Sequence, residues 1–339
     1  MGRTLWRTAA SFVVASVVMS TGAPASARIG DAARASSAIA YVAAQQLADG
    51  SFPGFSAVGS TADAVMDMAA TGFGGPTLTD AVAYLRGQVH GGDVTGVGLI
   101  AKVLLAAEAA RGAGRTGIDP TSFGGIDLIS AITTAEKASG RFEGASVFDQ
   151  ALAILALDSA GQTPTDAEAN WLADAQCPDG GWQFDRPYRS VENRHCRDTS
   201  DANDFTSSDT NTTAMAIMAL HGLMTPAVDP FRFFDAIRDE TFHGWGYTWG
   251  FHRTDANSTS LVIQAYRADG RPIPAGGKRA LRRLRYACGA VAYSFSADGA
   301  RTGRDIGATL GAVLGFLKEP FPVTPVSPHG TWATTCPQA

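Results

Sequence analysis

Three apolar segments in the second half of the chain follow the same polar pattern. Asp209 and Asn211 precede AMAIMAL, Asp255 and Asn257 precede SLVIQAY at the same offset, and Asp305 precedes GATLGAVLGFL. An Asp directly before a helix is a standard N-cap, because its carboxylate accepts N–H groups of the first turn. Asn is a poor residue inside a first turn, so the repeated Asn side chains fit a ligand-binding role. We expect these acids and amides to lie at one opening of the fold.

Aromatic side chains lie close to these polar residues in the sequence. The segment HGWGYTWGFH (243–252) directly precedes the second polar pattern, and Trp249 and His252 have no place in the repeats described below. Aromatic walls with few polar groups are typical of sites for apolar or ring-shaped ligands. The predicted ligand-binding residues are Phe55, Asp209, Asn211, Tyr247, Trp249, His252, Asp255, Asn257 and Asp305.

The sequence identifies no catalytic residue, and we predict neither a metal nor a cofactor. Asp198, Asp201 and Asp204 occupy every third position in a loop (185–208), but their spacing differs from that of an EF-hand calcium loop. We interpret this segment as a solvated loop, with calcium binding as the alternative.

The composition is that of a globular protein with a large core. Of the 339 residues, 45% are hydrophobic and 17% are charged, below the usual charged fraction of about 25%. The 27 Lys and Arg residues against 32 Asp and Glu give a net charge of −5. Proteins that bind nucleic acids normally present a basic face, so this balance argues against a nucleic-acid partner.

The first residues have the features of a signal peptide (1–27). Arg3 and Arg7 are followed by the apolar stretch AASFVVASVVM, and A-S-A at 25–27 is a cleavage pattern. The alternative is a membrane anchor, but the apolar stretch is shorter than the roughly 20 residues of a span. We therefore predict a secreted, extracellular protein whose mature chain has no transmembrane anchor.

Export favours disulfides for the four cysteines, since an even number in an oxidising compartment is typical of disulfide bonding. Cys177 and Cys196 flank one loop, so we pair them. Cys288 then pairs with Cys336 and ties a Pro-rich tail (319–339) back to the main domain (28–318). A metal site is the competing interpretation, but the chain has no C-x-x-C pair.

The chain contains internal repeats, which predict its fold. Each of six units reads as an amphipathic helix, a Gly-rich turn and a second helix that is apolar or small on all faces, as expected for a buried helix. We expect six inner helices inside six outer ones, an all-α (α/α)6 toroid. An open solenoid is the alternative, and it would need polar capping repeats. The inner segments begin near Ser60, Gly96, Phe148, Asp209, Asp255 and Asp305.

Two stretches also share a local motif, aromatic–aliphatic–x3–Q–x2–D–G–x–aromatic, at residues 41–52 and 171–182. The second copy resembles the QW repeat of squalene–hopene and oxidosqualene cyclases. The resemblance implies the α/α toroid that these cyclases share with protein prenyltransferase β subunits, complement thioester domains and vitamin B12 carriers. The Gln of the motif is suited to bond free backbone groups at helix ends, while the aromatic ring packs across them.

The catalytic signatures of these families are missing from the sequence. There is no D-x-D-D acid motif of the triterpene cyclases, no Asp-x-Cys pair for the zinc of prenyltransferases, and the only Cys-Gly pair lacks the Glu-Gln of thioester domains. Our first hypothesis is a secreted, non-catalytic module that binds a small molecule, either apolar or corrinoid-like as the B12 carriers imply. The alternative is a secreted enzyme on the same fold, similar to a terpene cyclase or to a polysaccharide lyase or hydrolase.

Overall fold

The computed structural model describes residues 25–184, 196 and 207–336. The predicted signal peptide (1–27) lies almost entirely outside the described residues, as do Asp198, Asp201 and Asp204. In the described part of the chain, no helix combines the length and the apolar character needed to cross a membrane.

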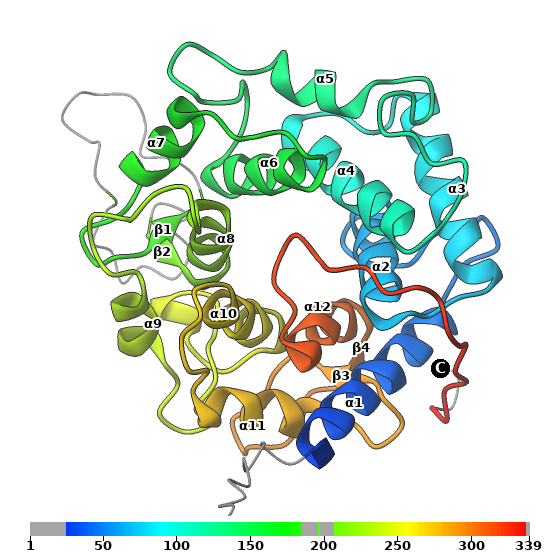
Figure 1. The fold of residues 1–339 in the computed structure, drawn as a ribbon. Coiled ribbons are helices and arrows are strands. Elements are labelled where there is room, and N and C mark those ends of the chain that lie inside the picture. Colours follow the sequence, from blue (N-terminus) through cyan, green and yellow to red (C-terminus); the bar gives the residue numbers. More distant parts are fainter. Residues whose placement is uncertain (1–24, 185–195, 197–206, 337–339) are drawn as a thin grey trace, which may run out of the picture.

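Six helices form a closed inner ring (Figure 1). Each packs against the next along the chain, and the last packs against the first. Their buried residues cover almost all faces, which explains why their sequences lack a clear polar side. The ring consists of α2 (Ala57–Thr71), α4 (Val97–Gly112), α6 (Val147–Ser159), α8 (Thr210–Leu220), α10 (Ala256–Ala268) and α12 (Ile306–Leu317).

A second set of six helices surrounds this ring (Figure 1). The first outer helix packs against both α12 and α2, so it spans the junction between the last and the first inner helix. The prediction of an all-α (α/α)6 toroid, closed rather than open, is therefore confirmed. The outer helices are α1 (Ala25–Ala43), α3 (Pro76–Gly91), α5 (Leu128–Thr133), α7 (Asp166–Asp174), α9 (Phe231–Ile237) and α11 (Ala275–Leu284).

Short extended segments lead into the inner helices. Each of the two antiparallel pairs is two residues long, and a 3-10 turn (Trp249–Phe251) precedes α10. The side chains of Ser56, Ser146, Asp209, Asp255 and Asp305 accept an N–H from the first turn of their helices, as the sequence predicts for the three acids. The pairs are β1 (Trp182–Gln183) with β2 (Ser208–Asp209), and β3 (Val291–Ala292) with β4 (Arg304–Asp305).

One hydrogen bond recurs where a turn meets an inner helix. A backbone N–H at the end of the turn donates to a side chain one turn into the helix, which fixes the angle between the two. The bonds join Phe52 to Thr61 (3.0 Å), Phe142 to Gln150 (3.0 Å), Trp182 to Thr213 (2.8 Å), Trp245 to Thr259 (3.0 Å) and Val291 to Thr309 (2.9 Å).

The motif glutamines connect consecutive outer helices. Gln46 Nε2 donates to the carbonyls of Gly50 (2.9 Å) and of Thr77 in α3. Gln176 Nε2 donates to Gly180 and, at 2.7 Å, to Val228, whose N–H donates back to Gln176 Oε1. The role that the sequence suggests for this Gln, bonding free backbone groups, is thus the one observed.

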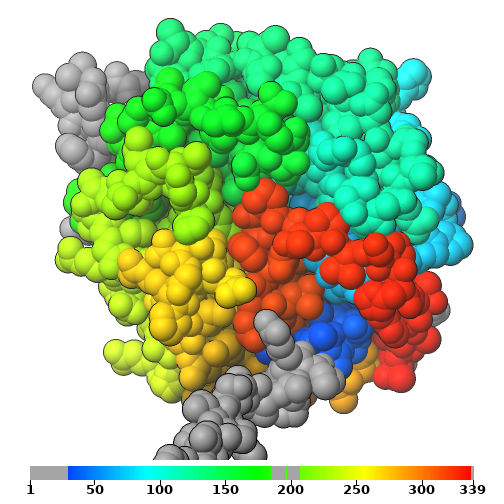
Figure 2. All heavy atoms as spheres, viewed as in Figure 1, coloured from blue at the N-terminus to red at the C-terminus, as the bar shows by residue number. Residues whose placement is uncertain are grey.

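The chain after α12 crosses the ring at the end where the inner helices finish (Figures 1 and 2). The N–H of Phe321 points to Met218 Sδ in α8 (3.4 Å), and the N–H of Val326 donates to Ala69 in α2 (2.8 Å). Further along, the N–H of His329 donates to Gly72, the left-handed residue that ends α2. The tail therefore covers one end of the ring.

Both predicted disulfides are present. Cys177 and Cys196 have Cα atoms 5.3 Å apart, and the Cα atoms of Cys288 and Cys336 are 4.9 Å apart. These separations lie within the range that a disulfide requires. The second bond attaches the end of the tail to the turn that follows α11.

Candidate functional site

The axis of the ring contains a cavity of about 190 Å³ that is lined by side chains from all six inner helices. Phe321 of the tail closes it at the end where these helices finish. Most of the wall is apolar. The apolar lining comes from Met66, Phe148, Leu152, Met215, Leu261, Leu310 and Leu314, and the polar lining from Asp63, Asp67, Lys102, Asn257 and Gln264.

Asp67 is one of the two most deeply buried polar residues of this cavity, together with Gln264. Its side chain is 2% exposed, and among the described residues Oδ2 has no hydrogen-bond partner. Burial, with a smaller contribution from the negative charge of Asp63, raises the pKa of Asp67 well above its usual value, and Lys102 opposes the shift. The carboxyl group therefore favours its neutral, protonated form.

Asp63 and Lys102 form an ion pair beside Asp67. Asp63 lies one helical turn before Asp67 on α2, and Lys102 Nζ approaches Asp63 Oδ2 to 2.7 Å from α4. Both side chains are about one-third exposed (35% and 28%), in contrast to Asp67. The pair thus lies on the solvent side of the cavity, towards the helix starts.

Two amide side chains line the cavity from α10. Gln264 is 2% exposed, and its Nε2 donates to Ser260 Oγ at 3.1 Å, while Oε1 has no partner in the part of the chain that the structure describes. Asn257 Oδ1 also lacks a partner within the described residues. A Cβ at Gly311 of α12 would collide with Asn257 Oδ1, so this glycine makes room for the amide.

Of the nine residues predicted from the sequence, Asn257 alone lines the central cavity in the described structure. Asp209 and Asp255 are buried N-caps, and desolvation raises the pKa of each to about 7 against the opposing hydrogen bonds from Thr212 and Ser258. The acids and amides share one end of the ring, as expected, because all sit at helix starts.

The remaining predicted residues lie around the helix starts, outside the cavity lining. Asp305 is an exposed cap of α12. Asn211, in the first turn of α8, is partly buried, and its Oδ1 has no hydrogen-bond partner among residues 25–184, 196 and 207–336. The 39% exposed Trp249 contacts the buried Phe233 edge to face, and the exposed His252 bonds the Trp249 carbonyl through Nδ1. Tyr247 accepts the first N–H of α8 through its carbonyl, and Phe55 is fully exposed.

The sequence analysis missed Asp63, Asp67, Lys102 and Gln264. A signal for them was present, because each is a polar residue within a segment that the repeats predict to be buried. Asp67 interrupts AVMDMAA, Lys102 interrupts LIAKVLLAAEAA and Gln264 interrupts SLVIQAY. A buried polar residue in such a segment needs either a partner or a function.

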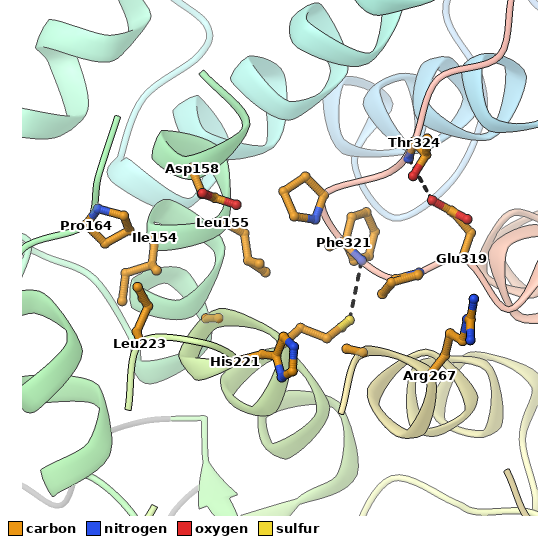
Figure 3. A pocket seen from close by; sticks show the side chains of 15 residues that line it. Ile154, Leu155, Asp158, Pro164, His221, Leu223, Arg267, Glu319, Phe321 and Thr324 are labelled. Carbon is orange, nitrogen blue, oxygen red and sulfur yellow. Dashed lines mark hydrogen bonds between the residues drawn. The ribbon is translucent and has the colours of Figure 1, made fainter. Parts of the chain in front are cut away.

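A larger hollow of about 550 Å³ lies at the other end of the ring, beside the tail (Figure 3). Ile154 and Leu155 of α6 face Phe321 and Glu319 of the tail across it, and Arg267 enters from α10. Its polar groups have partners or contact solvent; for example, Glu319 accepts the N–H of Thr324 at 2.7 Å. We therefore regard the smaller axial cavity as the candidate site.

Solved structures of known proteins have a similar fold. The GH76A alpha-1,6-mannanase from Salegentibacter sp. HEL1_6 matches with a TM-score of 0.53 and 13% identity, over 86% of this chain and 98% of the mannanase. The type II terpene cyclase MstE from Scytonema, in complex with its substrate geranylgeranyl dihydroxybenzoate, matches with a TM-score of 0.50 and 12% identity, over 87% and 99% of the two chains.

Comparing the sequence with known families and proteins does not assign this chain to a family. No family model matches the chain, and no curated protein matches it. Identities of 12% and 13% show the fold alone, and that fold is shared by two enzymes with different substrates. The chain is thus an α/α-toroid protein of the architecture found in the mannanase and the terpene cyclase.

Proposed function

We propose that the axial cavity binds a small, mainly apolar molecule that carries a polar group. The observation that carries this proposal is the pairing of apolar walls with buried polar atoms of Asp67, Asn257 and Gln264 that have no partner in the described structure. Each unsatisfied buried polar group costs about 1–3 kcal/mol. A ligand that hydrogen-bonds to these atoms while filling the apolar space recovers that cost.

The volume narrows the class of ligand. Sites for drug-sized molecules usually measure about 300–1,000 Å³, whereas this cavity measures about 190 Å³. We therefore favour a compact alicyclic or terpenoid molecule over a corrinoid. The terpenoid substrate bound by the Scytonema cyclase is consistent with an apolar ligand in this fold.

An acid-catalysed enzyme is the second candidate, and the environment of Asp67 favours it. A carboxyl group whose pKa is raised by burial in an apolar cavity is suited to act as a general acid towards a bound substrate. Asp63 and Lys102 would then set its charge environment, without themselves donating the proton. A proton-initiated reaction would be abolished by Asp67→Asn, whereas a pure binding protein would release its ligand unchanged.

A cavity-filling variant tests the binding proposal. Leu152→Phe places a larger side chain in the axial cavity, and Leu155→Phe makes the same change on the same helix at the other hollow. With borneol, a compact terpenoid alcohol, as probe, we expect a saturable rise in melting temperature for the wild type and Leu155→Phe. The Leu152→Phe variant should show no such rise in melting temperature. Undiminished borneol binding by a folded Leu152→Phe protein would contradict the proposal.

We also propose that the protein is exported. Two disulfides among the described residues support this, since such bonds persist mainly in oxidising compartments. Expression of the full chain in a bacterial host, followed by fractionation and mass determination, should yield a protein shortened near residue 28. An uncleaved chain retained in the cytoplasm would contradict export.

A further inference from the structure

The unsatisfied polar atoms of the axial cavity are all oxygens. Asp67 Oδ2, Asn257 Oδ1 and Gln264 Oε1 each lack a donor within the described part of the chain. Two of the three residues are 98% buried, so solvent does not supply the missing donors from outside. A ligand that satisfies these oxygens must bring N–H or O–H groups.

The charges around the cavity also favour a cationic ligand. Lys102 pairs with Asp63 at 2.7 Å, so an ionised Asp67 would have no cation in an ion pair with it among the described residues. On α3, which packs against α2, Asp80 is exposed and Arg86 bonds the Gly117 carbonyl. Charged groups at the other helices packed against α2 have partners of their own. Glu108 pairs with Arg111 on α4, Asp31 of α1 binds Arg34, Arg282 and Lys318, and Asp305 caps α12.

We propose that the cavity binds a compact apolar amine in its protonated form, whose ammonium group pairs with the carboxylate of Asp67. An ammonium group has N–H donors and no acceptor, which suits a carboxylate and amide oxygens that lack donors within the described residues. The apolar body then fills the space between Leu152, Leu261 and Leu310. This inference rests on the proposed binding function and specifies the chemical class of the ligand.

Binding of this kind is coupled to proton release. An alkylammonium resembles the Lys side chain, with a pKa near 10.4, so it stays charged at neutral pH. Burial and Asp63 shift Asp67 towards its protonated form, and an Asp67 that is protonated without ligand becomes ionised when the cation arrives. One proton therefore leaves for each amine bound, and the affinity rises with pH until Asp67 ionises without ligand.

Three probes of similar shape test the proposal by titration calorimetry: cyclohexylmethylamine, cyclohexylmethanol and cyclohexanecarboxylate. We expect the amine to bind at least tenfold more tightly than the alcohol, and the carboxylate not to bind. Titrations at one pH in two buffers with different ionisation enthalpies should report release of about one proton with the amine and none with the alcohol.

Variants assign the effect to Asp67. Asp67→Asn should lower the amine affinity at least tenfold and abolish proton release, while the alcohol still binds. Asp158→Asn, at an exposed position of α6 outside the cavity, is the matched control and should change neither. If Asp67→Asn does not fold, Gln264→Leu serves instead and should weaken the amine more than the alcohol.

The outcomes separate this inference from the proposed function. Equal affinity for amine and alcohol, or amine binding without proton release, overturns the amine assignment and leaves the binding function standing. Failure of both neutral and cationic probes to bind overturns both proposals.

Discussion

The backbone N–H of Trp182 donates a hydrogen bond to the hydroxyl of Thr213, 2.8 Å away on the next inner helix. The indole of the same residue is fully buried, and its N–H donates to the Leu172 carbonyl at the end of α7. One residue thus connects an outer helix, a turn and an inner helix.

Trp182→Ala should therefore destabilise the fold strongly. Truncation of a buried Trp typically costs about 3–5 kcal/mol, and the Leu172 carbonyl would also lose its donor. Urea unfolding followed by circular dichroism measures the change. Trp249→Ala is the control, because Trp249 is 39% exposed and should cost far less. Equal losses for the two variants would contradict this account of the motif.

Gln176→Ala should loosen the junction between α7 and α9. The change removes the bonds to Gly180 and Val228 and leaves backbone groups without partners, at about 1–3 kcal/mol for each one that stays buried. Gln162→Ala, at an exposed position, should be nearly neutral. Hydrogen exchange should show faster exchange of the Val228 N–H in the first variant. Unchanged protection there would argue against a structural role for the motif Gln.

The buried caps predict a pH-dependent stability. The pKa values of Asp209 and Asp255 rise from 3.8 to about 7 on folding, so the folded protein holds protons that the unfolded chain releases between about pH 4 and 7. Their contribution is complete below pH 4 and is lost as the pH rises to about 7. It amounts to up to about 4 kcal/mol for each carboxyl, at 1.36 kcal/mol per pKa unit.

The double variant Asp209→Asn and Asp255→Asn isolates this effect, because Asn caps a helix about as well as Asp but does not titrate. Relative to wild type, the variant should gain stability as the pH rises from 4 to 7 and show a constant difference above pH 8. Chemical denaturation over this pH range provides the comparison. A difference that does not vary with pH would mean that the caps remain ionised in the folded protein.

The two disulfides should differ in what they stabilise. Cys288 and Cys336 are separated by 48 residues, and Cys177 and Cys196 by 19. From the entropy that each bond removes from the unfolded chain, we expect the longer loop to stabilise the fold by about 4 kcal/mol and the shorter one by about 3 kcal/mol. Replacing Cys288 and Cys336 by Ser should also expose the tail to cleavage by chymotrypsin after Trp332, whereas the corresponding change at Cys177 and Cys196 should not. Resistance of the tail in the first variant would show that non-covalent contacts suffice.

The fold was predictable from the sequence because it depends on features that repeat. The apolar segments capped by Asp209, Asp255 and Asp305 predict buried helices. Because these helices have no polar face to expose, the pattern also predicts a closed ring. Gln176 and Trp182 make local bonds that the motif itself encodes.

The cavity was less accessible to sequence reasoning, because it depends on which helix faces meet across the ring. The pairing of Asp63 with Lys102 spans two repeats, and nothing in either segment alone indicates it. The aromatic cluster around Trp249 drew attention to the helix starts, but its ring packs against Phe233 of an outer helix instead of facing the axis. The closing position of Phe321 depends on a tail that belongs to no repeat.

Because Phe321 and the tail close one end, the ring is a cup and not a channel. Among the described residues, the partly exposed Asp63 and Lys102 lie on its open side, so the end of a molecule that enters there first is the last to leave. A molecule longer than the cup would leave its remainder outside, among the helix starts. Phe321→Ala would deepen the cavity at its closed end without widening its opening. The variant should therefore change how long a ligand can be and leave the chemical class of the ligand unchanged.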